Sequence, residues 1–168
     1  MSRFRLALLI AVVGLFAMPL SQVQAQDTAE LAKALKDTKV TLQDGLKASE
    51  REGKPISAKF EIEHNALQVS IYTMKGNDFM EVVADQKTGA VAKSEKITDA
   101  DDLKALAEQK AAMAKATVSL LAATDKAVKA NAGFRAISIY PKLQANHAVA
   151  EVTLLQGANF KKVMEKLD

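Results

Sequence analysis

The spacing of hydrophobic residues along the chain changes from a helical period to a strand period, and the change then repeats. Leu31 and Leu35 lie four residues apart, as do Leu42 and Leu46, which is typical of helices that bury one face. From Ile56 onward, hydrophobic and polar residues alternate, which is typical of strands with one buried face. The same order returns after residue 117, so the pattern predicts two units, each a helix followed by strands.

The first unit shows both ends of its helix and four alternating stretches. Thr41, with Asp44 three residues later, predicts the start of the helix, and Gly53 and Pro55 predict its end. Short polar or glycine-containing turns separate the stretches, which predicts antiparallel hairpins. The four predicted strands cover residues 56–64, 66–74, 79–85 and 90–97.

Residues 99–116 predict a helix that connects the two units, with Thr98 or Asp99 able to cap its start. A further helix is expected to run through Val128 and to end near Asn131. The alternating stretches that follow predict three strands, over residues 134–142, 147–157 and 159–167.

Identical residues at matching places support an internal repeat. The pairs lie 81 positions apart: Gly76 and Gly157, Phe79 and Phe160, Val82 and Val163. The starts of the two helices are 78 positions apart, so we expect a small insertion at the first hairpin of the second unit. The second copy stops before any counterpart of Thr88 and Gly89. The second unit should therefore close with one strand fewer, on a lysine-rich strand.

These elements predict an α+β fold of two repeated units, each a helix followed by three or four antiparallel strands. The two sheets could share a core or form one continuous sheet. We expect the helices to cover one face. The opposite, polar face would then be available for docking another protein.

The first 25 residues have the features of a secretory signal peptide. Arg3 and Arg5 precede an apolar run, and Val23 and Ala25, as small or tolerated residues, suit cleavage after Ala25. The predicted parts are a signal peptide over residues 1–25, a first unit over 26–98, a connecting helix over 99–116 and a second unit over 117–168. We expect a periplasmic or secreted protein with no stable membrane anchor after cleavage.

One stretch of the first unit carries a family resemblance. Residues 82–91, VVADQKTGAV, resemble the signature of the PepSY domain, in which a strand ends in Asp and is followed by two variable residues, Thr-Gly and another strand. The resemblance covers roughly residues 39–97, and a degenerate copy occupies 117–168. It implies a non-catalytic envelope protein that inhibits or modulates an extracytoplasmic peptidase.

The signature residues also have structural explanations. We expect the Asp85 carboxylate to cap the turn toward Thr88, and Gly89 to permit a positive φ there. Gly76 and Gly157 are expected to play the same part in other turns. Phe79 and Phe160 are expected to pack beneath a helix, or, if exposed, to form an apolar interaction pair.

The sequence offers little for catalysis or metal binding. His64 and His147 are its two histidines, and each lies near the first hairpin turn of its unit, where a paired metal or pH-sensing site is conceivable. The chain has no cysteine and no recognisable triad, HExxH or phosphate-loop motif. We expect neither an enzyme nor a bound cofactor or metal.

Charge and aromatic content narrow the range of partners. Without Arg3 and Arg5 the chain keeps 21 of its 23 basic residues against 20 acidic ones, which argues against a nucleic-acid partner. Two alternatives to a peptidase modulator remain. One is a structural or accessory envelope protein that self-associates, as in a homodimer. The other is a carrier of a small ligand between helix and sheet.

Overall fold

The computed structural model describes residues 28–168, so the predicted signal peptide and its cleavage after Ala25 lie outside the described residues. A short helical segment covers residues 28–34. The elements that follow are α2 (Leu42–Ser49), β1 (Lys54–Glu63), β2 (Ala66–Lys75), β3 (Asp78–Ala84), β4 (Val91–Lys96), α3 (Ala100–Met113), α4 (Leu120–Ala130), β5 (Arg135–Gln144), β6 (His147–Gln156) and β7 (Asn159–Lys166).

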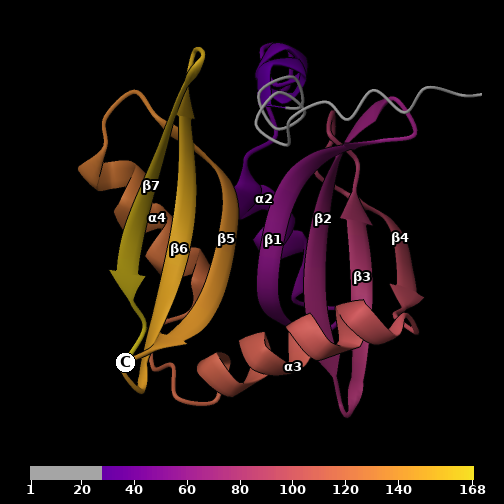
Figure 1. Cartoon of the computed structure of the whole chain (residues 1–168). Helices are drawn as coiled ribbons and strands as arrows, with labels where there is room; N and C mark the ends of the chain where they lie inside the picture. Colours follow the sequence, from indigo (N-terminus) through magenta and orange to yellow (C-terminus); the bar gives the residue numbers. More distant parts are fainter. Residues whose placement is uncertain (1–27) are drawn as a thin grey trace, which may run out of the picture.

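The strands form one seven-stranded antiparallel sheet in the order β4-β3-β2-β1-β5-β6-β7 (Figure 1). The predicted α+β class and the order of helix and strands in two units are therefore confirmed. The sequence left open whether the two units share a core or form one continuous sheet. The structure shows both: the strands form one sheet, and the core contains residues of both units.

The two units meet at the pair β1 and β5, where Ala58 lies opposite Ile139 and Lys59 opposite Ser138. Ala58 and Ile139 are 81 positions apart, so they are equivalent residues of the repeat. Antiparallel pairing of equivalent residues means that an approximate two-fold axis passes between them. Both side chains are fully buried, which makes this join the centre of the molecule.

The predicted insertion lies elsewhere than expected. Both first hairpins have two-residue turns with positive φ, at His64-Asn65 and at Ala145-Asn146, so neither hairpin contains an insertion. Instead α4 has 11 residues where α2 has 8. The three additional residues lengthen the helix, and every later element of the second unit is offset by 81. The hydrophobic pattern did not reveal the longer helix, because α2 and α4 show the same spacing of buried residues and differ only in length.

The bulges confirm that offset. The register of β1 with β2 shifts between Pro55 and Ser57, and that of β5 with β6 shifts between Ala136 and Ser138. The bulged residues, Ile56 and Ile137, are both buried. An extra residue at equivalent places in both units shows that the repeat extends to the details of strand geometry.

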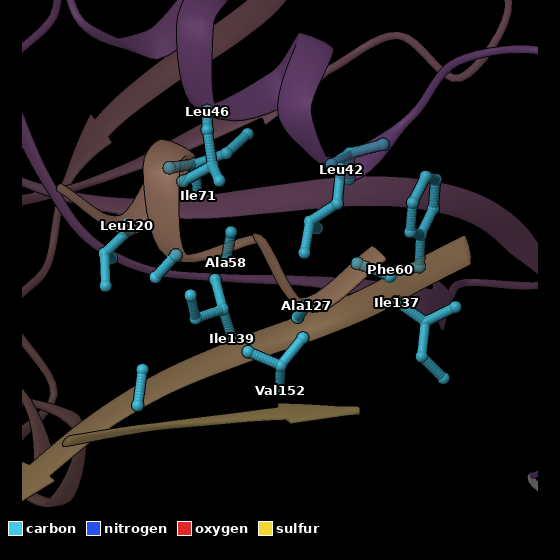
Figure 2. Packing of buried hydrophobic residues seen from close by; sticks show 14 of the residues in the cluster. Leu42, Leu46, Ala58, Phe60, Ile71, Leu120, Ala127, Ile137, Ile139 and Val152 are labelled. Carbon is cyan, nitrogen blue, oxygen red and sulfur yellow. The ribbon is translucent and has the colours of Figure 1, made fainter. Parts of the chain in front are cut away.

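The shared core lies between the sheet and the pair α2 and α4 (Figure 2). Leu42 and Leu46 come from α2, and Leu120 and Ala127 from α4. They pack with alternate residues of the strands, including Ala58, Ile71, Ile139 and Val152. The core thus combines both units, as expected for repeats too small to bury enough apolar surface alone.

We had expected all helices on one side of the sheet, and this prediction is wrong. Figure 1 shows α2 and α4 behind the sheet, whereas α3 crosses in front of its lower end. Lys110 of α3 lies over the ring of Phe79, whose side chain is on the side of the sheet away from α2. The hydrophobic pattern could not indicate the side taken by α3, because most of this helix is exposed. Its buried residues are Leu106, Ala112 and Met113.

The second unit has three strands and the first has four, as the repeat predicts. Where the first unit continues into its fourth strand, Leu167 of the second unit is completely buried. Its carbonyl accepts hydrogen bonds from the backbone N–H of Thr117 at 2.6 Å and of Val118 at 2.9 Å. These bonds fix the end of β7 against the segment that leads into α4.

Candidate protein-interaction face

The front face, defined as the side of the sheet opposite α2 and α4, is assigned from the side chains that alternate with the core. A Cβ on Gly45 of α2 would lie 2.9 Å from Val69 and 3.2 Å from Ile71, so these two residues point toward the helix. Their neighbours along the strands, such as Ser70 and Tyr72, therefore point to the front. The helix α3 covers one end of this face (Figure 1).

Charge is divided between the two halves of the front face. The half formed by β1–β4 carries more acidic than basic groups, and the half formed by β5–β7 carries more basic than acidic ones. On the first half lie Lys59, Lys93, Glu61, Glu63, Glu81 and Glu95; on the second lie Lys142, Lys162, Lys166 and Glu151. The two halves therefore present opposite net charges to a partner.

A half-buried ion pair lies beside the join of the two units. Lys59 Nζ is 2.5 Å from Glu61 Oε2 and lies 5.7 Å from the centre of the Tyr72 ring. Gln68 Nε2 donates to Glu63 at 2.6 Å and to Glu61 at 3.3 Å. The network links five side chains on β1 and β2, so this part of the face is rigid before any partner binds.

Burial and the surrounding charges change the pKa values of this cluster. Burial disfavours the charged form of Lys59, but its hydrogen bond and attraction to Glu61 outweigh that, and the pKa of Lys59 is raised. Burial raises the pKa of Tyr72 to about 12. Burial, together with the negative charges of Glu61 and Glu63, raises the pKa of Glu81. At neutral pH the lysine is thus fully charged and the tyrosine remains a neutral hydrogen-bonding group.

The basic half has one acidic group that two lysines share. Glu151 accepts from Lys142 at 2.9 Å and from Lys162 at 2.7 Å, and these bonds lower its pKa. On β7, Phe160 is 37% exposed and Met164 is 45% exposed. This strand therefore offers apolar side chains between lysines at the edge of the sheet.

The signature turn is built as the sequence predicts. The Asp85 carboxylate accepts from the backbone N–H of Thr88 at 2.8 Å, from its hydroxyl at 2.9 Å, and from the N–H of Lys87 at 3.1 Å. These bonds lower the pKa of Asp85. Gly89 has a φ of 71° and is buried against Val40 and Asp44 at the start of α2. The turn thus locks α2 onto the sheet, which is a structural role.

The repeat-matched residues lie at equivalent places. Gly76 and Gly157 begin the turns before β3 and β7, with φ of 63° and 62°. Val82 is fully buried on β3, whereas Val163 on β7 is only partly buried. The expectation that both phenylalanines pack beneath a helix is wrong for Phe160, because β7 is an edge strand. Phe79 is half-buried next to α3.

The two histidines lie too far apart for a shared site. His64 lies in the β1–β2 turn and is 91% exposed, while His147 begins β6 and its Nδ1 is 3.0 Å from a carboxylate oxygen of Asp168. Because β1 and β5 are antiparallel, the two turns lie at opposite ends of the sheet. The hypothesis of a paired histidine site is therefore wrong.

Several residues of the front face were missed from the sequence alone. The period of two places Lys59 and Glu61 on one polar face, and that signal could have identified the ion pair. Tyr140 has its pKa raised by burial, with smaller effects from Lys59 and Glu61 across the join. Its nearness to them depends on the pairing of β1 with β5, which no local pattern predicts.

Within residues 28–168 there is no group of three or more histidine, aspartate or glutamate side chains that could hold a metal ion. In the same part of the chain, no helix is long and apolar enough to cross a membrane. The arrangement of the front face is suited to binding through shape and charge.

Comparison with known proteins leaves the family unassigned. No family model matches the chain, and no curated protein matches it. Among solved structures, one that resembles it is a candidate lipoprotein from Clostridium difficile 630, with 17% sequence identity and a TM-score of 0.40. The match covers 80% of this chain and 91% of the other. The PepSY resemblance therefore remains an inference from the residues of the signature turn.

Proposed function

We propose that this chain is a non-catalytic binding protein of the cell envelope or the secreted fraction, which docks an extracytoplasmic peptidase on its front face and restrains or tunes it. The observation that carries the proposal is the division of that face into an acidic half and a basic half around a rigid central cluster. A partner with the opposite pattern would bind in one orientation only.

The composition of the face supports this role. Tyr72 and Tyr140 lie on β2 and β5 with Lys59 between them, and charged residues surround them toward both edges. Aromatic anchors within a polar rim are typical of protein-binding surfaces. The tyrosines are held by burial in the free protein, so little side-chain entropy remains to be lost on binding.

The choice of a peptidase as partner rests on the PepSY resemblance of residues 82–91, and the compartment rests on the predicted signal peptide. Both come from the sequence. Together they explain why a protein without a recognisable catalytic arrangement would be exported: its role would be exercised on another exported protein.

The test is capture of partners from an envelope fraction with the chain lacking residues 1–25. We expect a peptidase to be recovered and its activity to change when the protein is added. The variant Glu63→Lys/Glu95→Lys reverses the charge of the acidic half and should capture less. Glu50→Lys/Asp125→Lys, two exposed changes at the end of α2 and on α4 at the back, adds the same charge and is the matched control, which should behave like the wild type.

Two results would contradict the proposal. One is recovery of no peptidase together with unchanged proteolysis. The other is equal loss of capture in both charge variants, because a general charge effect would then replace a specific role of the front face.

A second candidate function is favoured by one cavity. A hollow of about 360 Å³ lies where α2, α3 and α4 approach one another. Leu46, Met113 and Leu120 form its apolar wall, and Glu50 and Lys54 lie at its rim. This size and composition suit a small apolar ligand. Native mass spectrometry of the purified protein should then show an added mass, and an unmodified mass would argue against a carrier.

A further inference from the structure

We propose that the outer edge of β7 pairs with β7 of a second copy of this chain. The two strands run antiparallel about a two-fold axis at Val163, and the two seven-stranded sheets become one continuous sheet. This inference does not depend on the identity of a peptidase partner.

Backbone geometry shows which groups of β7 are free. Gln156 and Asn159 flank a two-residue turn and so form a hydrogen-bonded pair, after which hydrogen-bonded and non-hydrogen-bonded pairs alternate. The N–H and C=O groups of Lys161, Val163 and Glu165 therefore point to β6. The bond from Leu167 N to Ala148 O, 2.9 Å, continues the same series. The outward-pointing N–H and C=O groups belong to the alternate residues Phe160, Lys162, Met164 and Lys166.

The first unit shows what such an edge can bind. The equivalents of Phe160 and Lys166 are Phe79 and Asp85. The carbonyl of Phe79 accepts from Ile97 N at 3.0 Å, and Asp85 N donates to Ala90 O at 2.9 Å. Residues before and after β4 thus bind the outward groups of β3 and its continuation. The described part of the second unit contains no strand at this place, so the outward groups of β7 are available to a new one.

The exposed apolar residues are concentrated at the same edge. Among the described residues, the large hydrophobic side chains that are exposed are Leu143, Phe160 and Met164, and two of them lie on β7. Their equivalents in the first unit, Phe79 and Val83, are half-buried. A strand added to β7 would place its own side chains beside Phe160 and Met164, as β4 places Lys93 beside Val83.

A second copy of β7 fits this edge in one register. With Val163 opposite Val163, each Lys161 lies opposite a Glu165, and each Lys162 lies opposite a Met164. On the front face, the Phe160 and Met164 side chains of both copies then form one diagonal apolar row. A centre at Lys162 places that lysine opposite itself, and a centre at Met164 places Lys162 opposite Lys166. The charges thus select Val163 as the centre.

The fold already uses this kind of pairing. At the join of the two units, equivalent strands β1 and β5 pair antiparallel about an approximate two-fold axis. The opposite edge of the sheet is less suited, because β4 exposes no large hydrophobic side chain and its Glu95 already lies opposite Glu81. The second copy would therefore add at β7 and leave β4 free.

Residual charge makes the pairing dependent on salt. Lys162 and Lys166 of both copies lie on the front face of the interface, while each Glu151 is shared by two lysines. Repulsion among the lysines weakens the dimer at low ionic strength, and salt screens it. The dimer should therefore strengthen as salt concentration rises, whereas a dimer held by ion pairs would weaken.

Cross-linking tests the register, since the chain contains no cysteine. In a non-hydrogen-bonded antiparallel pair the two Cα atoms lie about 4.5 Å apart, which a disulfide can span. Val163→Cys should oxidise to a covalent dimer. Lys161→Cys, on the same side of β7, would place its two thiols four residues apart and should form no disulfide-linked dimer. Lys93→Cys on β4 is the control for the other edge.

Light scattering over a range of protein and salt concentrations tests the dimer itself. Met164→Pro removes one outward N–H and one exposed apolar side chain without breaking a bond to β6, so it should fold normally and remain monomeric. Circular dichroism checks the fold.

Four results would overturn the proposal. They are a wild type that stays monomeric at all concentrations, a Met164→Pro variant that still dimerises, cross-linking of Val163→Cys no greater than that of Lys93→Cys, and equal cross-linking through Lys161→Cys. If the wild type is monomeric and Met164→Pro loses only the capture of an envelope protein, the edge of β7 binds that protein instead of a second copy.

Discussion

Single side chains fix the starts of the two helices differently. At α2 the Thr41 side chain accepts from Asp44 N at 3.1 Å, and the Asp44 carboxylate accepts from Thr41 N at 2.8 Å. At α4 the Ser119 side chain accepts from Ala122 N at 3.1 Å, but an alanine at this position cannot return the bond. The first unit thus has a reciprocal cap and the second has half of one.

We therefore expect Thr41→Ala to cost more stability than Ser119→Ala. The loss of a helix cap typically lowers the free energy of unfolding by about 1 kcal/mol. Thr41→Ala also removes the hydroxyl that binds Asp44, so its effect should be the larger of the two. Urea unfolding of both variants measures the difference, and equal or reversed losses would contradict the prediction.

The raised pKa of Glu81 predicts a pH-dependent gain from its removal. The folded state holds the proton of Glu81 more tightly than the unfolded state, because burial and the neighbouring Glu61 and Glu63 disfavour its charge. Stability is therefore lost as pH rises from the ordinary pKa of 4.5 through the raised one.

Glu81→Gln should raise the melting temperature at pH 7, and the gain should disappear near pH 4, where the wild-type group is protonated. Thermal melts at both values measure this. Glu50→Gln, an exposed change at the end of α2 on the other side of the sheet, is the control. A gain that is the same at both pH values would show that Glu81 acts through packing instead of charge.

At the scale of elements, the close approach of α2 to the sheet depends on a glycine. The nearest atoms to a Cβ on Gly45 would be those of Val69 and Ile71 on β2. At the equivalent places the second unit has Ala123 on α4 and Ala150 on β6. The two units therefore place different pairs of residues at the contact between helix and sheet. The first has a glycine and a valine, and the second has two alanines.

Gly45→Ala should destabilise the protein by about 1–3 kcal/mol, even though alanine favours helices more than glycine does. Val69→Ala should also destabilise it, because it leaves a cavity. In the double variant the new methyl group occupies space that the valine vacates, so the loss should be smaller than the sum by at least about 0.5 kcal/mol. Additive losses in chemical denaturation would contradict this account.

Most elements could be predicted from the sequence because their signals are local. The alternation in β1–β3, the capping residues of α2 and α3 and the Asp85 turn all depend on residues close in the chain. The pairing of β1 with β5 could not be predicted, because its partners are about 80 positions apart and both strands have similar patterns. The position of Tyr140 beside Lys59 follows from that join, whereas the exposure of Phe160 follows from the place of β7 at the edge of the sheet.

At the scale of the whole molecule, the join makes the two units depend on each other. Arg135 of the second unit donates to the backbone carbonyls of Leu35 at 3.1 Å, Thr38 at 3.2 Å and Val40 at 2.6 Å, all in the first unit. The core is continuous across β1 and β5. Neither unit can open at the join without exposing the other.

We therefore expect a single cooperative unfolding transition. Tyr72 and Tyr140, one in each unit, are the only tyrosines and the chain has no tryptophan, so tyrosine fluorescence reports on the region of the join. Its unfolding curve should coincide with that of far-ultraviolet circular dichroism. Two separated transitions would show that the units fold independently.

The two-fold join also bears on how such a chain can change. Two separate copies of one unit, paired through this strand, would come together only at sufficient concentration, whereas one polypeptide holds them at a high effective concentration. Once the halves are linked, they no longer need to be identical. One half has a fourth strand that fills its edge, and the other ends its sheet on an open one, so an internally symmetric molecule has a single open edge, and two-fold pairing there stops at two copies.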